Sequence, residues 1–396
     1  MRVSVIGAGS WGSALAQHLA LSGNEVVLWA RSAALVEQIN ARHENPAYLS
    51  DIVFSERIVA TTDLVWALRD TQAVVLATPS AAVRTICQAM ATSYPATVPL
   101  LLLSKGVENS SGTLLLDVIR EELSRGSTVN ATTGIVSSAP AVTDCNVNGD
   151  RGGLGNDTGS GLGSDIGSSL GSDTESIAAG ATVDNPKSVA PLQLAVLSGP
   201  NHAEEVAKTM FSATVIASSN SDTARLFQQL LASDNFRVYT SSDTIGVQVC
   251  GAAKNVIAIA TGVAVGRKFG DNATAMLMTR GLAEISRLVE ARGGMSQTCM
   301  GLAGMGDLIA TCTSVHSRNR SFGLALAKGT SIAEYEQHSH MVVEGALAAK
   351  SVTNLAQNLG VEMPICETMR GVIWEGLPLQ ETIPDLMKRS AKPEFY

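Results

Sequence analysis

The residue best suited to chemistry is Lys254, in the small and apolar stretch Gly251-Ala252-Ala253-Lys254-Asn255-Val256. Burial disfavours the charged form of a lysine and lowers its pKa, so a lysine in such a place is costly unless it is paired or functional. A lysine with a lowered pKa can donate and accept a proton near neutral pH. The alternative to a functional role is that only the apolar stem of Lys254 is buried, while its ammonium group reaches water.

The turn Gly7-Ala8-Gly9-Ser10-Trp11-Gly12 follows the apolar run Val3–Ile6 and begins a helix-like stretch. In this context a glycine pattern predicts a dinucleotide site. Gly7 permits the tight turn, Gly9 lets the backbone approach a pyrophosphate, and Gly12 permits close packing of helix on strand. The free N–H groups at the helix start favour phosphate. The alternative is an ordinary glycine turn between strand and helix.

The end of the second apolar run bears on which nicotinamide cofactor is used. An NAD-selective site usually has Asp or Glu there, to bond the ribose hydroxyls. This chain reads Trp29-Ala30-Arg31-Ser32, without a carboxylate. Arg31 could pair with a 2′-phosphate, which favours NADPH, with NADH also open. The alternative for Arg31 is a solvated surface arginine.

Four further segments bear on a substrate. The stretches Ser104-Lys105-Gly106 and Ser198-Gly199-Pro200-Asn201 each follow an expected strand, where ligands approach such sheets. In the third, Gly304–Leu308, Asp307 follows a glycine turn and could be either functional or a simple helix cap. In the fourth, Ser317–Arg320, Arg318 and Asn319 could hold a phosphate at a helix start. Taken singly, none of these segments decides the function.

The elements that must position these residues fall into two groups. Runs of strand length, separated by helix-like stretches, lie at Val3–Ile6, Glu25–Trp29, Ala73–Thr78 and Val98–Leu103, and again at 192–197, 213–217 and 236–239. Such alternation predicts a parallel sheet covered on both faces. From about residue 244 onward only helical patterns occur. We therefore expect an α/β, Rossmann-like dinucleotide-binding domain at 1–126 and 191–242, and an all-α substrate and catalytic domain at 243–396.

Residues 127–190 interrupt the first domain and are rich in Gly, Ser, Thr, Asn and Asp. Because this composition buries little apolar surface, it predicts a disordered, solvated insert. One unit, Gly152–Asp157, matches a calcium-binding β-roll repeat, but that architecture needs stacked copies at a nine-residue period and the period here is eight. Calcium binding and a docking role stay as alternatives for the insert, and we expect no metal site elsewhere.

Composition excludes several classes. The chain has 396 residues, of which 45% are hydrophobic, so it holds two or three domains with sizeable cores. Its 28 basic and 36 acidic residues give a net charge of −8, which argues against nucleic-acid and anionic-membrane binding. We see no aliphatic run near the roughly 20 residues of a membrane span and no signal-peptide pattern. Six scattered cysteines suit a reducing cytoplasm.

Taken together and in order, the motifs resemble those of the bacterial NAD(P)-dependent glycerol-3-phosphate dehydrogenases. The matching segments are Gly7–Gly12, Ser104–Gly106, Ser198–Pro200, Gly246–Gln248 leading to Lys254–Ala258, Thr279–Glu284, Gly304–Leu308, Ser317–Asn319 and Val343–Gly345. The resemblance covers nearly all of 1–126 and 191–380. The segment 127–190 departs from the family pattern.

The resemblance implies a cytoplasmic homodimer that reversibly reduces dihydroxyacetone phosphate to sn-glycerol 3-phosphate with NAD(P)H, and so supplies the backbone for phospholipid synthesis. It implies that Lys254 is the catalytic proton-transfer residue and that Asp307 lies in the same site. With the glycine turn, the expected cofactor contacts are Gly7, Gly9, Ser10, Trp11, Gly12, Arg31, Lys105, Ala203, Arg318, Val342 and Glu344. The expected substrate contacts are Lys105, Gly199, Asn201, Lys254, Asp307, Ser317, Arg318 and Asn319. Asn201 stands where other members have Ser or Thr.

Two other readings of the sequence stay open. One is a different dehydrogenase of the same architecture, acting on a hydroxy acid or a sugar nucleotide. The other is a non-catalytic, dinucleotide-binding redox sensor, against which Lys254 and Asp307 together argue.

Overall fold

The computed structural model describes residues 1–132, 191–339, 342–382 and 394. From residue 133 onward the expected insert lies outside the described residues, and so do the disorder, calcium and docking alternatives attached to it. The helix α5 (Leu115–Thr132) continues past residue 126, where we expected the sheet domain to break off.

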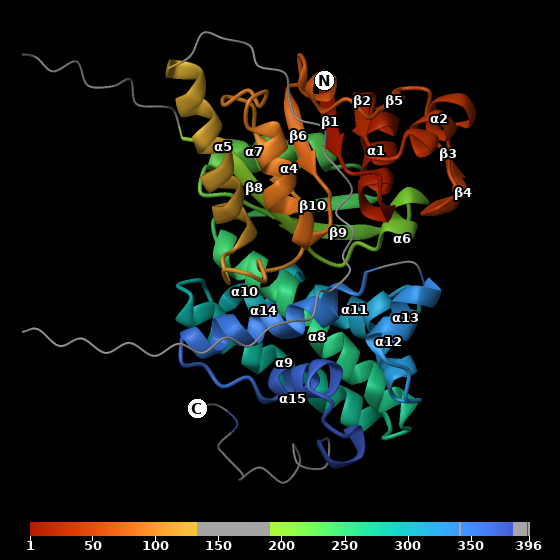
Figure 1. The fold of residues 1–396 in the computed structure, drawn as a ribbon, viewed down its shortest axis with the longest axis vertical. Helices are drawn as coiled ribbons and strands as arrows, with labels where there is room; N and C mark the ends of the chain where they lie inside the picture. Colours follow the sequence, from red (N-terminus) through yellow and green to blue (C-terminus); the bar gives the residue numbers. More distant parts are fainter. Residues whose placement is uncertain (133–190, 340–341, 383–393, 395–396) are drawn as a thin grey trace, which may run out of the picture. The chain divides into compact units, whose positions relative to one another are not determined.

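The N-terminal half contains an eight-stranded sheet in the order β10-β9-β8-β7-β6-β1-β2-β5 (Figure 1). The strands are β1 (Arg2–Ile6), β2 (Glu25–Trp29), β5 (Ile58–Thr61), β6 (Ala73–Leu76), β7 (Leu100–Leu102), β8 (Leu194–Ser198), β9 (Ser212–Ala217) and β10 (Phe236–Ser241), and a separate hairpin joins β3 (Glu44–Asn45) to β4 (Leu49–Val53). The six strands from β8 to β5 are parallel. This arrangement confirms the predicted Rossmann-like fold.

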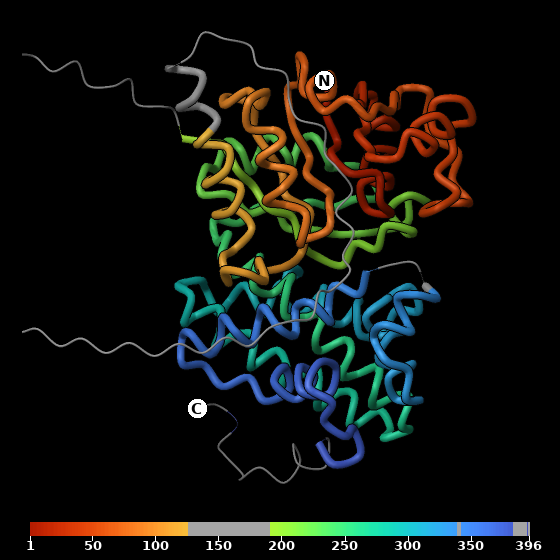
Figure 2. Tube along the Cα trace, viewed as in Figure 1, coloured from red at the N-terminus to blue at the C-terminus, as the bar shows by residue number. Residues whose placement is uncertain are grey.

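The sheet combines two distant parts of the sequence. Strand β8 pairs with β7, although the whole expected insert lies between them in the chain. Figure 2 shows the green segment after residue 190 beside the orange segment that ends before it. The strand alternation on either side of the insert therefore builds one sheet.

The last two strands differ from the expected continuation, because β9 pairs with β8 in the antiparallel sense and β10 follows β9. The connection from β8 to β9 contains only the short helix α6 (Ala203–Ala207). Five residues of helix rise about 7.5 Å, which is too short to return the chain along a strand, as a parallel crossover requires. The chain therefore reverses direction at the end of β8.

Helices cover both faces of the sheet. On the first face, Val3 and Val5 of β1 share a core with Leu15 and Phe227, which come from two helices. On the opposite face, Ile6 packs among residues of two further helices. These helices are α1 (Ser10–Leu21), α7 (Ser221–Leu231), α4 (Val83–Met90) and α5, with α2 (Ala33–Arg42), α3 (Leu64–Leu68) and the 3₁₀ turn η1 (Ser80–Ala82) completing the half. Alternate side chains of one strand thus enter different cores, as the period of two requires.

The C-terminal half is helical. Its elements are α8 (Thr244–Gly266), α9 (Asp271–Ala291), α10 (Gln297–Met300), the π turn η2 (Leu302–Gly306), α11 (Asp307–Thr313), α12 (Arg318–Leu326), α13 (Ile332–Ser339), α14 (Glu344–Asn358) and α15 (Pro364–Trp374). Helix α8 packs against α9, α11, α12, α14 and α15. A Cβ on Gly262 would lie 2.2 Å from the carbonyl oxygen of Arg320, so glycine permits the close crossing of α8 and α12.

Helix α8 is long and apolar enough to cross a membrane by length and composition, with a mean hydropathy of 1.6 over its most apolar stretch. We did not anticipate this from the sequence, where small Ala and Gly residues make the run inconspicuous. In the structure 89% of that stretch is buried inside the protein, so α8 is the core helix of the C-terminal half.

A buried acid from a different helix caps the start of α15. Glu284 of α9, 3% exposed, accepts hydrogen bonds from the backbone N–H groups of Ile365 at 2.9 Å and Cys366 at 3.4 Å. Burial raises the pKa of Glu284 to about 7, although the two N–H groups favour the ionised form. Glu284 therefore ties the last helix to α9 and titrates close to neutral pH.

We expect Glu284→Gln to alter the pH dependence of stability. Because the folded-state pKa of about 7 exceeds the ordinary 4.5, the unfolded chain releases this proton first as the pH rises. The wild type should therefore lose stability relative to the variant between pH 4.5 and 7, and the difference should stay constant above that. Thermal midpoints across this range test the expectation, with Glu290→Gln, exposed on the same helix, as the control. A difference that does not vary with pH would contradict it.

Candidate active site

Three loops at the carboxyl ends of parallel strands bring polar groups to one edge of the sheet. Gly7 directly follows β1, Lys105 lies three residues beyond β7, and Ser198 ends β8. Ligands of doubly wound sheets bind at this edge. Here hydrogen bonds join the edge to Asp307 of α11 and Glu344 of α14.

The carboxylate of Asp307 joins most of these groups. Its Oδ1 accepts a hydrogen bond from Lys254 Nζ, and its Oδ2 accepts from Lys105 Nζ at 2.7 Å. Oδ2 also accepts from Ser198 Oγ at 2.9 Å and from the backbone N–H of Gly199 at 3.4 Å. Asp307 is 3% exposed and Lys254 is 5% exposed. Burial and pairing therefore describe Lys254, in place of an ammonium group that reaches water.

The charges in this cluster shift both ionisation equilibria. Burial lowers the pKa of Lys254 to about 8, with Asp307 opposing the shift and the neighbouring charge of Lys105 adding to it. Burial alone would raise the pKa of Asp307, but Lys105 and Lys254 outweigh it and lower that pKa to about 2. With both lysines protonated, two positive charges face one negative charge, so the cluster favours an anionic ligand and an oxygen that develops negative charge.

Thr311 belongs to this cluster, although we did not select it from the sequence. Its Oγ1 accepts a hydrogen bond from Lys254 Nζ at 2.6 Å and donates to the backbone carbonyl of Asp307 at 2.6 Å. A spacing of four residues on one helix was the available signal, because it places Thr311 on the same face as Asp307. Ser198 belongs to the segment Ser198–Asn201, but its residue type alone indicated no role for it.

The start of α12 combines a helix cap, an exposed cation and a buried amide. Ser317 caps the helix by accepting from the N–H of Arg320 at 3.2 Å. Asn319 donates to Asn255 Oδ1 at 3.0 Å and accepts from the N–H of Gly345 at 2.8 Å. The side chain of Arg318 is exposed. Of the three expected substrate contacts here, only Arg318 has a polar head that is free of hydrogen bonds to the described residues.

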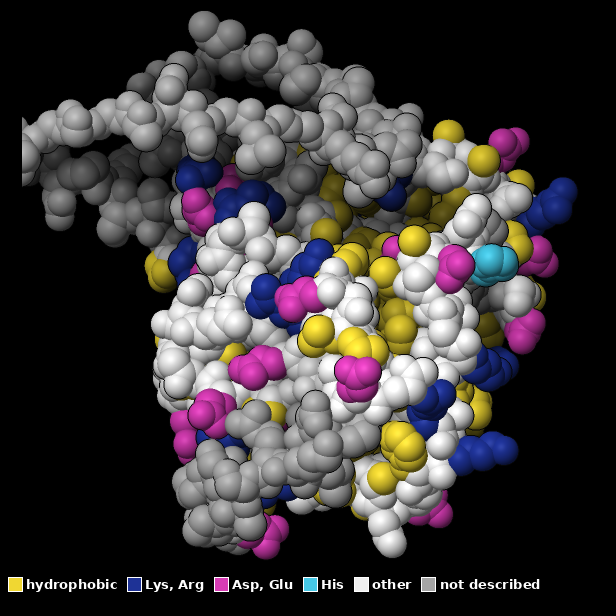
Figure 3. All heavy atoms as spheres, turned by 60° about the horizontal axis from the view of Figure 1, so that its bottom comes forward, with side chains coloured by type: hydrophobic (Ala, Val, Ile, Leu, Met, Phe, Trp, Pro, Cys, Tyr) yellow, Lys and Arg dark blue, Asp and Glu magenta, His cyan; other side chains and the backbone are white. Residues whose placement is uncertain are grey.

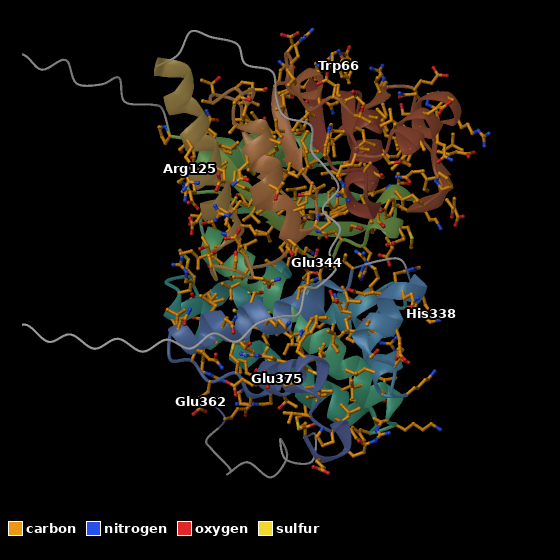
Figure 4. The ribbon with its side chains drawn as sticks, viewed as in Figure 1. Trp66, Arg125, His338, Glu344, Glu362 and Glu375 are labelled. Atoms are coloured by element: carbon orange, nitrogen blue, oxygen red, sulfur yellow. The ribbon has the colours of Figure 1, made fainter. Side chains whose placement is uncertain are left out.

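Glu344, labelled in Figure 4, joins the loop after β6 to the start of α14. Its carboxylate accepts hydrogen bonds from Ser80 Oγ at 2.6 Å and from the Ser80 N–H at 3.2 Å. Burial raises the pKa of Glu344, which these hydrogen bonds oppose. Nearby along the chain, Val342 is 43% exposed. Ser80 is a second partner that the sequence did not reveal.

The loop after β8 is shaped by a glycine and an amide. Gly199 has φ +152°, and a Cβ there would lie 2.8 Å from the Cα of Thr214, so no other residue fits without displacement. Asn201 donates to Thr214 Oγ1 at 2.9 Å, while its own Oδ1 is buried and accepts no hydrogen bond from the described residues. Ala203 follows as the first residue of α6. The Oδ1 of Asn201 is therefore an unsatisfied acceptor in this loop.

The glycine turn has the shape that a dinucleotide needs. Gly7 has φ +118°, and a Cβ on Gly12 would lie 1.8 Å from the Gly7 carbonyl oxygen. A Cβ on Gly9 would meet nothing within 4 Å, and no side chain caps the N–H groups of α1, which begins at Ser10. The buried Nε1 of Trp11 donates to no described residue. Open space, uncapped N–H groups and an unpartnered indole N–H all fit a bound NAD(P).

Arg31 stands apart from this cluster. It is exposed in the loop after β2, and no described hydrogen bond or ion pair joins it to the other expected site residues. The neighbouring Ser32 caps α2 by accepting from the N–H of Leu35. Nothing in this loop replaces the carboxylate that an NAD-selective site usually has.

The described surface shows no strong separation of charge on the face in Figure 3, where acidic and basic side chains are interspersed with small apolar patches. Among the described residues, no group of three or more His, Cys, Asp or Glu is arranged to hold a metal ion.

Comparison with known proteins assigns the chain to a family. The model of the NAD-dependent glycerol-3-phosphate dehydrogenase N-terminus matches residues 2–143 and 179–224, and that of the C-terminus matches 243–384. A glycerol-3-phosphate dehydrogenase, NAD(P)+, of Myxococcus xanthus is 39% identical over 395 residues, which cover 100% of this chain and 99% of the relative. One of Prosthecochloris aestuarii is 37% identical over 100% of both chains.

A solved structure agrees with these sequences. The crystal structure of glycerol-3-phosphate dehydrogenase from Coxiella burnetii superimposes with a TM-score of 0.78 at 32% identity, covering 98% of this chain and 99% of that one. Fold, motif order and sequence identity over the whole length lead to one conclusion: this chain belongs to the family of NAD-dependent glycerol-3-phosphate dehydrogenases.

Proposed function

We propose that the chain catalyses the reversible reduction of dihydroxyacetone phosphate to sn-glycerol 3-phosphate with NAD(P)H, and so supplies glycerol phosphate for phospholipid synthesis. The observation that supports this most directly is the buried Lys254–Asp307–Lys105 cluster at the carboxyl edge of a dinucleotide-binding sheet. A phosphorylated ketone is an anion whose carbonyl oxygen gains negative charge on reduction. The cluster places the Lys254 ammonium group where that negative charge develops and leaves the site with a net positive charge.

The nicotinamide cofactor supplies the hydride for C2 of the ketone. The turn shaped by Gly7 and Gly12 would let the backbone approach the pyrophosphate at Gly9, with the uncapped N–H groups from Ser10 onward and the free indole N–H of Trp11 beside it. The remaining proposed cofactor contacts are Arg31, Lys105, Ala203, Arg318, Val342 and Glu344.

Lys254 donates a proton to the C2 oxygen during reduction and takes it back during oxidation. Its pKa of about 8 is close enough to neutral for both directions. Asp307 stays ionised, holds the ammonium in place and prevents a larger loss of basicity. Thr311 accepts a second hydrogen bond from that ammonium, which leaves its third N–H for the ligand. Lys105 and the loop with Gly199 and Asn201 complete the substrate contacts.

Arg318 holds the substrate phosphate. Its guanidinium is exposed at the first turn of α12, where the helix N-terminus also favours an anion. Ser317 and Asn319 are occupied by a helix cap and by Asn255 and Gly345, so they position the turn that presents Arg318. Phosphate binding energy would then orient the carbonyl for attack.

The setting that we propose is a homodimer in the cytoplasm, acting on small molecules without nucleic acid or membrane. The support is the resemblance to the family, the net charge of −8 and the absence of disulfides among the described cysteines. We also propose that the sheet domain comprises 1–126 and 191–242 and the helical domain 243–396. NADPH is the cofactor that Arg31 favours.

Lys254→Ala should lower kcat by about 100-fold or more, as expected for loss of a general acid. In the wild type, reduction should slow as the pH rises through about 8, because the protonated form is the donor, and oxidation should accelerate over the same range. Initial rates of NADPH and NADH oxidation with dihydroxyacetone phosphate measure the reduction, and initial rates of NADP+ and NAD+ reduction with sn-glycerol 3-phosphate measure the oxidation. The exposed Lys328→Ala is the control. Unchanged turnover in the Lys254 variant would remove this residue from the chemistry.

Arg318→Ala should raise KM for dihydroxyacetone phosphate by about tenfold or more, since a hydrogen bond to a charged group contributes about 1.5–3 kcal/mol. With unphosphorylated dihydroxyacetone the variant and the wild type should differ little in kcat/KM. Arg318→Lys keeps the charge but loses the bidentate geometry, so its KM for dihydroxyacetone phosphate should lie between those of the wild type and Arg318→Ala. Equal losses with both ketones would show that Arg318 does not recognise the phosphate.

Arg31→Ala should raise KM for NADPH by about tenfold and leave KM for NADH almost unchanged, because only NADPH has a 2′-phosphate to pair with the guanidinium. Arg42→Ala, exposed at the end of α2, is the matched control. Parallel titrations of the two cofactors at saturating ketone give the comparison. A similar change for both cofactors would rule out recognition of the 2′-phosphate by Arg31.

A further inference from the structure

Two buried cysteines outside the proposed machinery lie within reach of each other. Cys250 of α8 and Cys299 of α10 are 0% and 1% exposed, and their sulfur atoms are 3.6 Å apart. Both are free thiols. A disulfide needs a sulfur–sulfur distance of about 2.05 Å, so an approach of about 1.5 Å would join them.

The two thiols are not equivalent. The hydrogen bond between them lowers the pKa of Cys299, helped by Ser286 and opposed by burial. The same hydrogen bond and burial raise the pKa of Cys250 well above its ordinary value. Cys299 is therefore the more acidic of the two thiols. Since the thiolate is the reactive form of cysteine, the pair has a nucleophile and a resolving thiol.

Only a short surface segment separates Cys299 from solvent. Helix α10 has only four residues, and its last, Met300, is 71% exposed, while Met295 just before the helix is 52% exposed. Asp243 fastens this segment by accepting from the Met295 N–H at 2.9 Å and from the Thr298 hydroxyl. Short surface elements with few internal hydrogen bonds open locally more readily than core helices. A small oxidant could then reach Cys299 without global unfolding.

We propose that Cys250 and Cys299 are an oxidative modification site, in which a peroxide joins the two sulfurs in a disulfide that inactivates the enzyme. The Cys299 thiolate attacks one peroxide oxygen, the O–O bond breaks, and the departing hydroxide takes a proton to become water. The sulfur of Cys250 then attacks the sulfenic sulfur, the S–O bond breaks and a second water leaves. Two thiols and one hydrogen peroxide thus give one disulfide and two waters.

The pair is connected to the proposed chemistry from both sides. Cys250 precedes Lys254 by one turn of α8, and a Cβ on Gly304 would lie only 2.2 Å from the carbonyl oxygen of Cys299. Gly304 belongs to η2, which leads directly into Asp307. Because α10 and η2 pack this closely, drawing Cys299 toward α8 moves the turn before Asp307. The contacts of Lys254 with Asp307 and Thr311 depend on hydrogen-bond geometry and would not tolerate a shift of about 1.5 Å.

The test uses the full chain and hydrogen peroxide as the probe. We expect at least a tenfold loss of activity, loss of two titratable thiols and a Cys250–Cys299 cross-linked peptide by mass spectrometry. Dithiothreitol should restore both thiols and activity. The activity measurement rests on the proposed function, whereas the peptide mapping does not. A protein that is inactive before treatment would contradict the proposed function. The mapping would still decide whether the disulfide forms.

Variants separate the pair from other oxidised groups. Cys250→Ser and Cys299→Ser should each resist inactivation, whereas Cys366→Ser, at another buried cysteine, should stay as sensitive as the wild type. If either Ser variant fails to fold, the other variant and the peptide mapping of the wild type still show whether this disulfide causes the inactivation. The proposal is overturned if inactivated enzyme lacks the cross-linked peptide or if cross-linked enzyme keeps full activity. It is also overturned if dithiothreitol does not reverse the loss, as for oxidation of Met300.

Discussion

The structure depends on one buried carboxylate shared by two ammonium groups. Asp307 begins α11 in the helical half, Lys254 comes from α8, and Lys105 comes from the loop after β7. Burying these charges is unfavourable unless each is compensated, and removing one partner of such a pair typically costs about 3–5 kcal/mol. The same three charges that hold the halves of the site together set the proton affinity of Lys254. Stability and chemistry are therefore difficult to separate at this position.

Small residues make this arrangement possible. Around Lys254, α8 is built from Gly, Ala and other compact side chains, so strands and helices can approach its axis closely. A Cβ on Gly251 would lie 3.2 Å from Ser198 Oγ, which is already bonded to Asp307. The small, apolar residues that make α8 resemble a membrane span are thus the residues that allow neighbouring elements to pack around Lys254 on all sides.

Much of this could be predicted from the sequence, because the strand–helix alternation and the glycine turn are local patterns. The high cost of burying an unpaired lysine in a small, apolar helix likewise marked Lys254 without any knowledge of its partners. The reversal at β9 was not predictable in the same way, since it depends on how little helix α6 provides for a return. Thr311, Ser80 and the bonds of Asn319 also escaped prediction, because each depends on a partner distant in sequence or on the exact phase of a short helix.

The attachment points of the long insert have a practical consequence. Strands β7 and β8 are parallel neighbours, so α5 between them must return the chain to the amino-terminal edge of the sheet, opposite to the edge that holds Lys105 and Ser198. Residues 132 and 191 therefore leave and rejoin the fold on the side remote from the reacting groups. Closing a longer loop there costs little, about 0.6 kcal/mol for each doubling of its length. A reporter protein or affinity handle grafted at this junction would leave the catalytic edge unencumbered.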